Sequence, residues 1–251
     1  MSIDERGARW PTEAPEKKDT KVAIVQSSYI PWKGYFDLIN MSDEFVLLDD
    51  VKYNGTWRNR NRILTAGGPR WLTIPVAHDH VEPFLRVSET RVADPRWARK
   101  HWDILRSHYR RAPCFPQFCA IFAELYRELA AETRLSRINA RFITLVCELL
   151  GIKTRITWSM DLPSVSGKNE RIISICQALG ATEYISGPAA KVYIEPEQFD
   201  AAGIRLTYID YSGYPEYPQL HGPFDHAVSI VDLLFNTGAD APRFMRSFGH
   251  V

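Results

Sequence analysis

KVAIVQSSYIPWKGYFDLINMSDEFVLLDDVKY, residues 21–53, contains the pattern from which the fold class can be predicted. Within it, residues 22–25 are a continuous apolar run, which indicates a buried strand. Residues 34–41 carry apolar side chains at helical spacing, and residues 45–48 form a second apolar run that ends at two aspartates. A strand followed by a helix and another strand predicts a parallel pair joined by a crossover. We therefore expect an α/β fold with a mostly parallel sheet.

Polar residues that follow these two strands are the first candidates for a site, because parallel sheets bind ligands beyond the carboxyl ends of their strands. The candidates for binding a cofactor or phosphate are Gln26, Tyr29, Trp32, Gly34 and Tyr35. The candidates for catalysis are Asp49, Asp50 and Lys33. A carboxylate can act here as a general base or as a magnesium ligand, and a lysine stabilises developing negative charge. The alternative for the two aspartates is a strand-end turn that pairs with nearby arginines.

The next segment predicts an antiparallel hairpin. Residues 57–64 and 70–76 have the composition of strands, and Ala-Gly-Gly-Pro lies between them as a turn. In the first strand, alternation sends three arginines to one face and two asparagines to the other. Guanidinium groups suit phosphate or carboxylate ligands, although a solvated strand face is the alternative. The candidates for binding a substrate are Asn59, Arg60, Asn61 and Arg62, on the same strand as Arg58.

Three helices without intervening strands follow, which predicts a helical insertion over about residues 95–150. His101 lies on the first of them and is a candidate for substrate binding, or alternatively a histidine of the core. Residues 210–224 form a loop rich in proline and tyrosine, which is typical either of a lid or of a surface loop packed by its own aromatic residues. Its candidates for substrate binding are Tyr217, Gln219 and His221.

Strands and helices alternate again over residues 154–209, which predicts further parallel strands. Two loops in this part suit an anion, because small residues let backbone N–H groups approach it and a lysine adds charge. Neither loop has the spacing of a Walker motif. The candidates for cofactor binding in these loops are Lys168, Ser186, Gly187 and Lys191.

Composition narrows the class of protein. The chain has 251 residues, of which 45% are apolar, so residues 21–251 can form one α/β domain behind a disordered tail of residues 1–20. A net charge of +1 argues against nucleic acid or an anionic membrane as the main partner. The four cysteines lack metal spacing, and neither a signal peptide nor an apolar membrane span is present. We expect a cytoplasmic protein that binds no metal through side-chain clusters.

Several segments together resemble the WbqC-like family. They are residues 26–53, the WRNRNRI and WLTIPV strands, KHW, LGATEYISGPAAKVY, and YPQLHGPF with SIVDLLFN. The resemblance implies a bacterial protein encoded among genes for O-antigen and other surface polysaccharides. It also implies a transferase that attaches glycine or another acyl group to an amino sugar.

A looser similarity concerns the first strand–helix unit, which resembles that of HUP-type nucleotidyltransferases. In that family an H-x-G-H motif opens the helix and contacts ATP phosphates. Trp32 and Tyr35 stand here in place of the two histidines. The similarity implies a HUP-like or Rossmann-like sheet and makes ATP with magnesium the candidate cofactor.

These observations predict an enzyme that transfers an acyl or aminoacyl group, such as glycyl, to an amine of a nucleotide-linked amino sugar or a related small molecule, with ATP as a candidate activator. The first alternative is a protein that binds a nucleotide or nucleotide sugar without chemistry. The second alternative is an RNA-binding module that uses the arginine hairpin, which the near-neutral charge disfavours.

Overall fold

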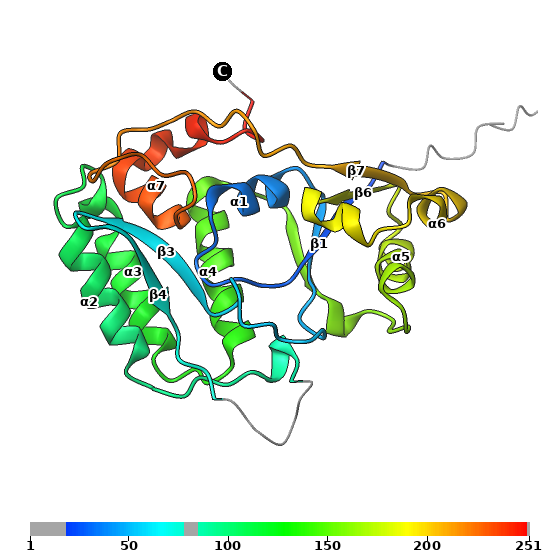
Figure 1. The fold of residues 1–251 in the computed structure, drawn as a ribbon, viewed down its shortest axis with the longest axis horizontal. Coiled ribbons are helices and arrows are strands. Elements are labelled where there is room, and N and C mark those ends of the chain that lie inside the picture. Colours follow the sequence, from blue (N-terminus) through cyan, green and yellow to red (C-terminus); the bar gives the residue numbers. More distant parts are fainter. Residues whose placement is uncertain (1–18, 78–84, 250–251) are drawn as a thin grey trace, which may run out of the picture.

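The structure is a computed structural model that describes residues 19–77 and 85–249 (Figure 1). At its centre lies a sheet of five parallel strands in the order β5-β2-β1-β6-β7. The strands are β1 (Lys21–Val25), β2 (Glu44–Leu47), β5 (Arg155–Trp158), β6 (Glu183–Ser186) and β7 (Arg205–Tyr208). Counted in chain order within this sheet, the strand order is 3-2-1-4-5, which is the doubly wound arrangement. The predicted α/β fold with a parallel sheet is confirmed. The tail predicted for residues 1–20 lies almost entirely outside the described residues.

Both faces of the sheet are covered by helices, which explains why β1 and β2 each contain a continuous apolar run. In β1, Ala23 faces the hydrophobic cluster that contains α1 (Lys33–Asn40) and α4 (Leu135–Leu150). Val22 and Ile24 face a second cluster. That cluster contains side chains of α5 (Lys168–Ala178) and α6 (Pro196–Ala201). Alternate residues of one strand therefore hold the two layers of helices on opposite faces.

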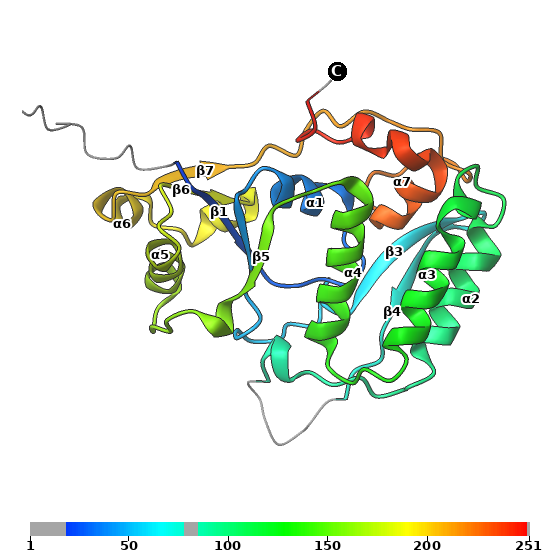
Figure 2. The same cartoon turned by 180° about the vertical axis from the view of Figure 1, so that it is seen from behind.

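A lobe is inserted between β2 and β5 and lies beside the sheet (Figures 1 and 2). It contains an antiparallel hairpin and three helices, which confirms the predicted insertion. Its elements are β3 (Arg60–Thr65), β4 (Gly68–Thr73), α2 (Trp97–Tyr109), α3 (Phe115–Leu129) and α4. The last helix, α7 (Ile230–Thr237), returns to the lobe and packs on α3 and β3. Short 3₁₀ helices are η1 (Val87–Glu89), η2 (Ser159–Asp161), η3 (Pro188–Val192) and η4 (Gly238–Phe244). Within the described ranges, no helix has the length and apolar character needed to cross a membrane.

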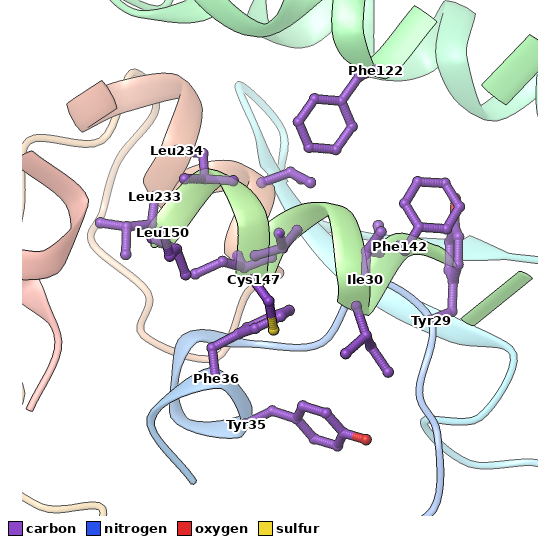
Figure 3. Packing of buried hydrophobic residues seen from close by; sticks show 14 of the residues in the cluster. Tyr29, Ile30, Tyr35, Phe36, Phe122, Phe142, Cys147, Leu150, Leu233 and Leu234 are labelled. Carbon is purple, nitrogen blue, oxygen red and sulfur yellow. The ribbon is translucent and has the colours of Figure 1, made fainter. Parts of the chain in front are cut away.

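Helix α4 joins the lobe to the sheet. Figure 3 shows its residues Phe142 and Cys147 between Phe36 of α1 and side chains of the lobe, including Phe122 of α3. The ring centroids of Tyr126 and Phe142 lie 5.0 Å apart, which is a favourable edge-to-face distance. The helix ends at Gly151 with φ of 72°, a conformation that glycine adopts without strain. Helix α4 thus packs against both the sheet region and the lobe.

Two boundaries differ from the predicted ones. The first hairpin strand begins at Arg60 rather than at residue 57, because the carbonyls of Trp57 and Arg58 accept hydrogen bonds from the Tyr29 amide at 3.3 and 3.2 Å instead of pairing with β4. Helix α5 begins at Lys168, immediately after Gly167 at φ 92°, whereas the helical pattern of residues 171–179 predicts a start three residues later. The first boundary is set by a contact with a residue distant in the sequence, and the second follows a glycine in a positive-φ conformation.

Truncation of Phe142 to alanine is expected to destabilise the protein by about 3–5 kcal/mol, because it leaves a cavity where sheet and lobe meet. The matched control is Ile121→Ala on α3, whose side chain is 39% exposed. Urea unfolding of both variants measures the difference. Equal losses in the two variants would contradict the role given to α4.

Candidate functional site

A cavity of about 1090 Å³ opens at the carboxyl ends of β1 and β6. Val25 at the end of β1 and Gln26 directly after it line the cavity, as do Ser186 at the end of β6 and Gly187 directly after it. The chain leaves β1 toward β2 on one side of the sheet, whereas β6 pairs with β1 on the other side. This is the switch point at which doubly wound sheets bind their ligands. It is the candidate functional site of the chain.

The polar wall of the cavity is rich in cations. Arg58, Lys168 and Arg171 line it together with one carboxylate, Asp50. The Asp50 carboxylate accepts a hydrogen bond from Arg171 Nη2 at 2.8 Å and another from Ser159 Oγ at 2.6 Å. Arg171 is therefore compensated inside the protein, while Arg58 and Lys168 give the wall a positive character. Such a wall favours an anionic ligand.

The rest of the lining is apolar and aromatic, as is usual for a small-molecule site. The aromatic members are Trp32, Tyr35, Trp57, Tyr184, Tyr193 and Tyr211. The Trp32 and Tyr211 rings meet edge to face with centroids 5.0 Å apart. These walls offer flat surfaces on which a ring of a ligand can pack.

The start of α1 is covered by an indole ring. A Cβ atom added to Gly34 would lie 2.4 Å from Cζ2 of Trp32, so the glycine makes room for the tryptophan. The Tyr35 hydroxyl donates to the carbonyl of Gln26 at 3.1 Å. Trp32 and Tyr35, which stand where the nucleotidyltransferase resemblance places histidines, both line the cavity. Gly34 therefore acts through Trp32 and does not itself line the site.

The structure brings part of the predicted site together at this cavity. The predicted residues that line it are Gln26, Trp32, Tyr35, Asp50, Asn61, Lys168, Ser186 and Gly187. The predicted residues that lie elsewhere are Tyr29, Lys33, Gly34, Asp49, Asn59, Arg60, Arg62, His101, Lys191, Tyr217, Gln219 and His221. Arg58 lines the cavity although it was not among the candidates. Alternation grouped it with two other arginines, and the sequence carries no signal that distinguishes the three.

Two predicted catalytic residues lie behind the cavity wall. The Lys33 ammonium donates to the carbonyl of Pro215 at 3.2 Å and lies 4.7 Å from the centroid of the Tyr214 ring. Its burial lowers the pKa of Lys33 to about 8. Asp49 accepts a hydrogen bond from the Ser27 amide at 2.8 Å, and burial raises the pKa of its carboxyl group. Both groups hold neighbouring loops in place.

The hairpin residues follow the predicted alternation, with buried asparagines between half-buried arginines. The Asn59 amide donates to Ile74 O at 2.8 Å. The Asn61 amide donates to Ile30 O at 2.9 Å, which ties the hairpin to the loop after β1. Arg60 and Arg62 do not line the cavity: the Arg60 guanidinium lies 4.6 Å from the Trp71 ring, and Arg62 Nε donates to Ala227 O at 3.1 Å.

The tyrosine-rich loop is fastened mainly to α7. Asp232 accepts hydrogen bonds from Tyr217 Oη at 2.8 Å, Gln219 Nε2 at 2.9 Å and Tyr109 Oη at 2.7 Å. His221 Nε2 lies 3.1 Å from the carbonyl of His108. The three predicted substrate residues of this loop thus pack against the lobe, while Tyr211 of the same loop lines the cavity. These contacts hold Tyr217, Gln219 and His221 against the lobe and away from the cavity lining.

Lys168 and Lys191 are both exposed lysines near a tyrosine ring, but they differ in their position relative to the cavity. Lys168 Nζ lies 5.5 Å from the Tyr193 ring, and Lys191 Nζ lies 5.0 Å from the Tyr208 ring. Only the first lysine lines the cavity. The pair therefore offers a matched comparison between a cation inside the site and one beside it.

Tyr29, His101 and Tyr126 form a buried hydrogen-bonded chain in the lobe. His101 Nε2 lies 3.2 Å from the carbonyl of Thr73, so this nitrogen carries the proton. Nδ1 then accepts from the Tyr29 hydroxyl at 2.9 Å, and Tyr29 accepts from Tyr126 at 2.6 Å. Burial lowers the pKa of His101 to about 4. The predicted binding residues Tyr29 and His101 therefore join α2, α3, β4 and the loop after β1.

Acid is expected to destabilise the protein through His101. The unfolded histidine binds its proton near pH 6.5, whereas the folded one does so only near pH 4. The free energy of unfolding therefore falls between these values, by about 3 kcal/mol in total. Urea unfolding of wild type and His101→Gln from pH 7.5 to 4 measures the slope, which should be shallower in the variant. Identical slopes would contradict a neutral buried histidine.

Within the part of the chain that the structure describes, no group of three or more His, Cys, Asp or Glu residues is arranged to hold a metal ion. The four cysteines are free, and burial raises the pKa of Cys147 and of Cys176 to about 12. These two thiols therefore stay protonated and weakly nucleophilic at neutral pH.

The sequence of this chain is similar to that of known proteins. The model of the WbqC-like protein family matches residues 26–244, which include the hairpin, the lobe, α7 and the cavity lining apart from Ile24 and Val25. The chain belongs to the WbqC-like family. It is 46% identical over 230 residues to the uncharacterized protein Rv1507c of Mycobacterium tuberculosis, an alignment that covers 90% of this chain and 97% of the relative. No solved structure matches. Most of the lining of the switch-point cavity therefore lies within the part that this WbqC-like chain shares with its family.

Proposed function

We propose that this WbqC-like protein is an enzyme that binds a nucleotide-linked or similarly anionic small molecule in the switch-point cavity and transfers an acyl or aminoacyl group to an amine. The observation that carries the proposal is the cavity itself, which combines a cationic wall with aromatic walls at the end of a doubly wound sheet. Its volume of about 1090 Å³ suffices for two small substrates or one nucleotide-linked one.

The start of α5 supports an anionic ligand. Gly167 is the N-cap of this 11-residue helix and has φ of 92°, and the carboxylate of Glu170 in the first turn lies close to it. The N–H groups of a first turn carry partial positive charge, to which Lys168 adds a full charge. Gly167 and Lys168 line the cavity, whereas Glu170 does not. Phosphate oxygens placed here would be stabilised by backbone and side chain together.

Asp50 is the carboxylate proposed to act on the amine. Arg171 and Ser159 fix its orientation, and it lines the cavity. In the transfer step the amine nitrogen forms a bond to the carbonyl carbon of an activated acyl donor, and the bond between that carbon and its leaving group breaks. The proton that the amine loses passes to Asp50 as general base. The donor is a thioester or an acyl adenylate by chemical class.

A second candidate function is binding of a nucleotide sugar without chemistry. The observation that favours it is that both carboxylate oxygens of Asp50 already accept hydrogen bonds from protein groups, as in a structural ion pair. Product formation separates the two functions. Protein incubated with an acyl donor and an amino sugar nucleotide yields an amide detectable by mass spectrometry if the protein is an enzyme.

Ligand class is tested by thermal unfolding of the wild-type protein with ATP and magnesium, acyl-CoA esters and nucleotide sugars. A ligand at 100 times its Kd stabilises the folded state by about 2.7 kcal/mol. A shift with ATP favours adenylation of the acyl group, and a shift only with CoA esters favours direct transfer. If none of these ligands raises the unfolding temperature, the proposed function is wrong.

Lys168→Met is expected to weaken binding of the stabilising ligand about tenfold, because it removes one cation from the site. Lys191→Met is the matched control, since it removes an equally exposed lysine that also lies over a tyrosine ring. Titration calorimetry of both variants measures the affinities. Equal losses would show that the ligand does not occupy the cavity near α5.

Asp50→Asn is expected to reduce amide formation by about 100-fold or more while changing ligand affinity much less. Ser159→Ala is the control, because it removes the hydroxyl that contacts Asp50 and leaves the carboxylate paired with Arg171. Product formation is measured by mass spectrometry. A variant that loses affinity and turnover in equal proportion would contradict the role of general base.

A further inference from the structure

Arg58 lies where the hairpin segment meets the loop after β1. Its Nη1 donates to the carbonyl of Gln26 at 2.8 Å and to that of Ser27 at 3.3 Å. Its Nε is buried and has no hydrogen-bond partner in the described part of the chain. The side chain also lines the cavity. One edge of the guanidinium thus binds the protein, while the Nε and Nη2 edge makes no hydrogen bond to the described residues.

The positive charge of Arg58 is not neutralised by a direct ion pair with any described residue. Asp49 acts on it electrostatically, but Asp49 Oδ1 accepts from the Ser27 amide and Oδ2 has no partner among the described residues. Arg171 of the same cavity, by contrast, pairs with Asp50 at 2.8 Å. A buried charge is costly unless it is paired, so an unpaired guanidinium at a cavity wall indicates a place for an anion.

The backbone around Arg58 is held rigidly. Asn139 of α4 donates through Nδ2 to Arg58 O at 2.9 Å and to Ser27 Oγ at 3.1 Å. The Tyr29 amide donates to Arg58 O at 3.2 Å. The lobe therefore fixes the base of this side chain relative to the end of β1. A cation held in this way loses little conformational entropy when it binds a ligand.

We propose that Arg58 is the anion anchor of the cavity and that it binds an oxyanion group of the ligand, a carboxylate or a phosphate. Guanidinium groups recognise both through paired N–H donors. The inference rests on the proposed function in that it uses the same cavity, and it adds the residue that fixes the anionic end of the substrate. Lys168 and the start of α5 then supply a second point of contact, toward β6.

The test measures binding of pyrophosphate and of acetate to wild type, Arg58→Met and the control Arg62→Met. Arg62 lies on the same hairpin, outside the cavity lining, near Asp225 at 3.8 Å. Loss of Arg58 should weaken binding of the preferred probe about 30-fold, and loss of Arg62 less than about threefold. Preference for pyrophosphate assigns the anchor to a phosphate, and preference for acetate assigns it to a carboxylate. Wild-type affinity in Arg58→Met overturns the inference.

Arg58→Met also leaves the carbonyls of Gln26 and Ser27 without this donor, so Arg58→Lys is measured in parallel. Lysine keeps the charge and one ammonium donor but loses the fork, so its affinity for the probe should fall at least about fivefold. An unchanged affinity in Arg58→Lys also overturns the inference. If neither probe binds wild type while a neutral ligand stabilises it, the inference that Arg58 binds an anion is wrong. The proposal that the cavity binds a ligand then still holds. If no ligand of any class binds, the proposed function fails as well.

Discussion

The buried position of β1 between β2 and β6 determines where the cavity, the loop after β1 and the hairpin lie. Hydrophobic clusters cover both faces of this strand, and the chain that follows it emerges at the carboxyl edge of the sheet. Its two neighbours continue in opposite directions across the sheet, which leaves room above its end because no connection crosses there. The following loop is then forced against the hairpin and α4, where backbone groups of Tyr29 and Asn139 side-chain donors hold residues 57–58. Cavity, loop and hairpin are thus consequences of one strand position.

Electrostatics divides the cations of the site into two kinds. Arg171 is tied to Asp50 and to the carbonyl of Ser159 at 2.7 Å, so its charge is used within the protein. Arg58 has carbonyl partners only, and carbonyls satisfy hydrogen bonds without neutralising charge. This difference is invisible to counts of charge, since the whole chain carries a net charge of +1. A nearly neutral protein can still present a cationic wall when its carboxylates pair with selected arginines.

Several residues that have the chemistry of catalysts serve packing in this chain. His101 is kept neutral by burial, and Asp232 gathers three donors from α2 and the tyrosine-rich loop. Such satisfied polar networks hold the lobe in one arrangement against the sheet. Because α4 belongs to both parts and fixes the backbone of Arg58, the order of the lobe bears directly on the geometry of the cavity.

The amino-acid sequence was sufficient to predict whether most segments form helices or strands. Apolar runs and helical spacing show which side chains of a segment are buried, and this pattern lies within the segment itself. The short run of residues 183–186 predicts a strand, and the apolar spacing of residues 135–150 predicts a helix, and both elements have these bounds in the structure. The sequence also predicted that Gln26, Asp50, Lys168 and Ser186 meet, because carboxyl ends of parallel strands share one edge. Only tertiary structure decided which neighbour of each pair faces the cavity: Asp50 rather than Asp49, and Arg58 rather than Arg60. Which side chain faces the cavity depends on the backbone conformation of irregular loops, where side chains do not alternate regularly. Contacts with residues distant in the sequence, such as Asn139 with Arg58 and Arg171 with Asp50, fix these directions.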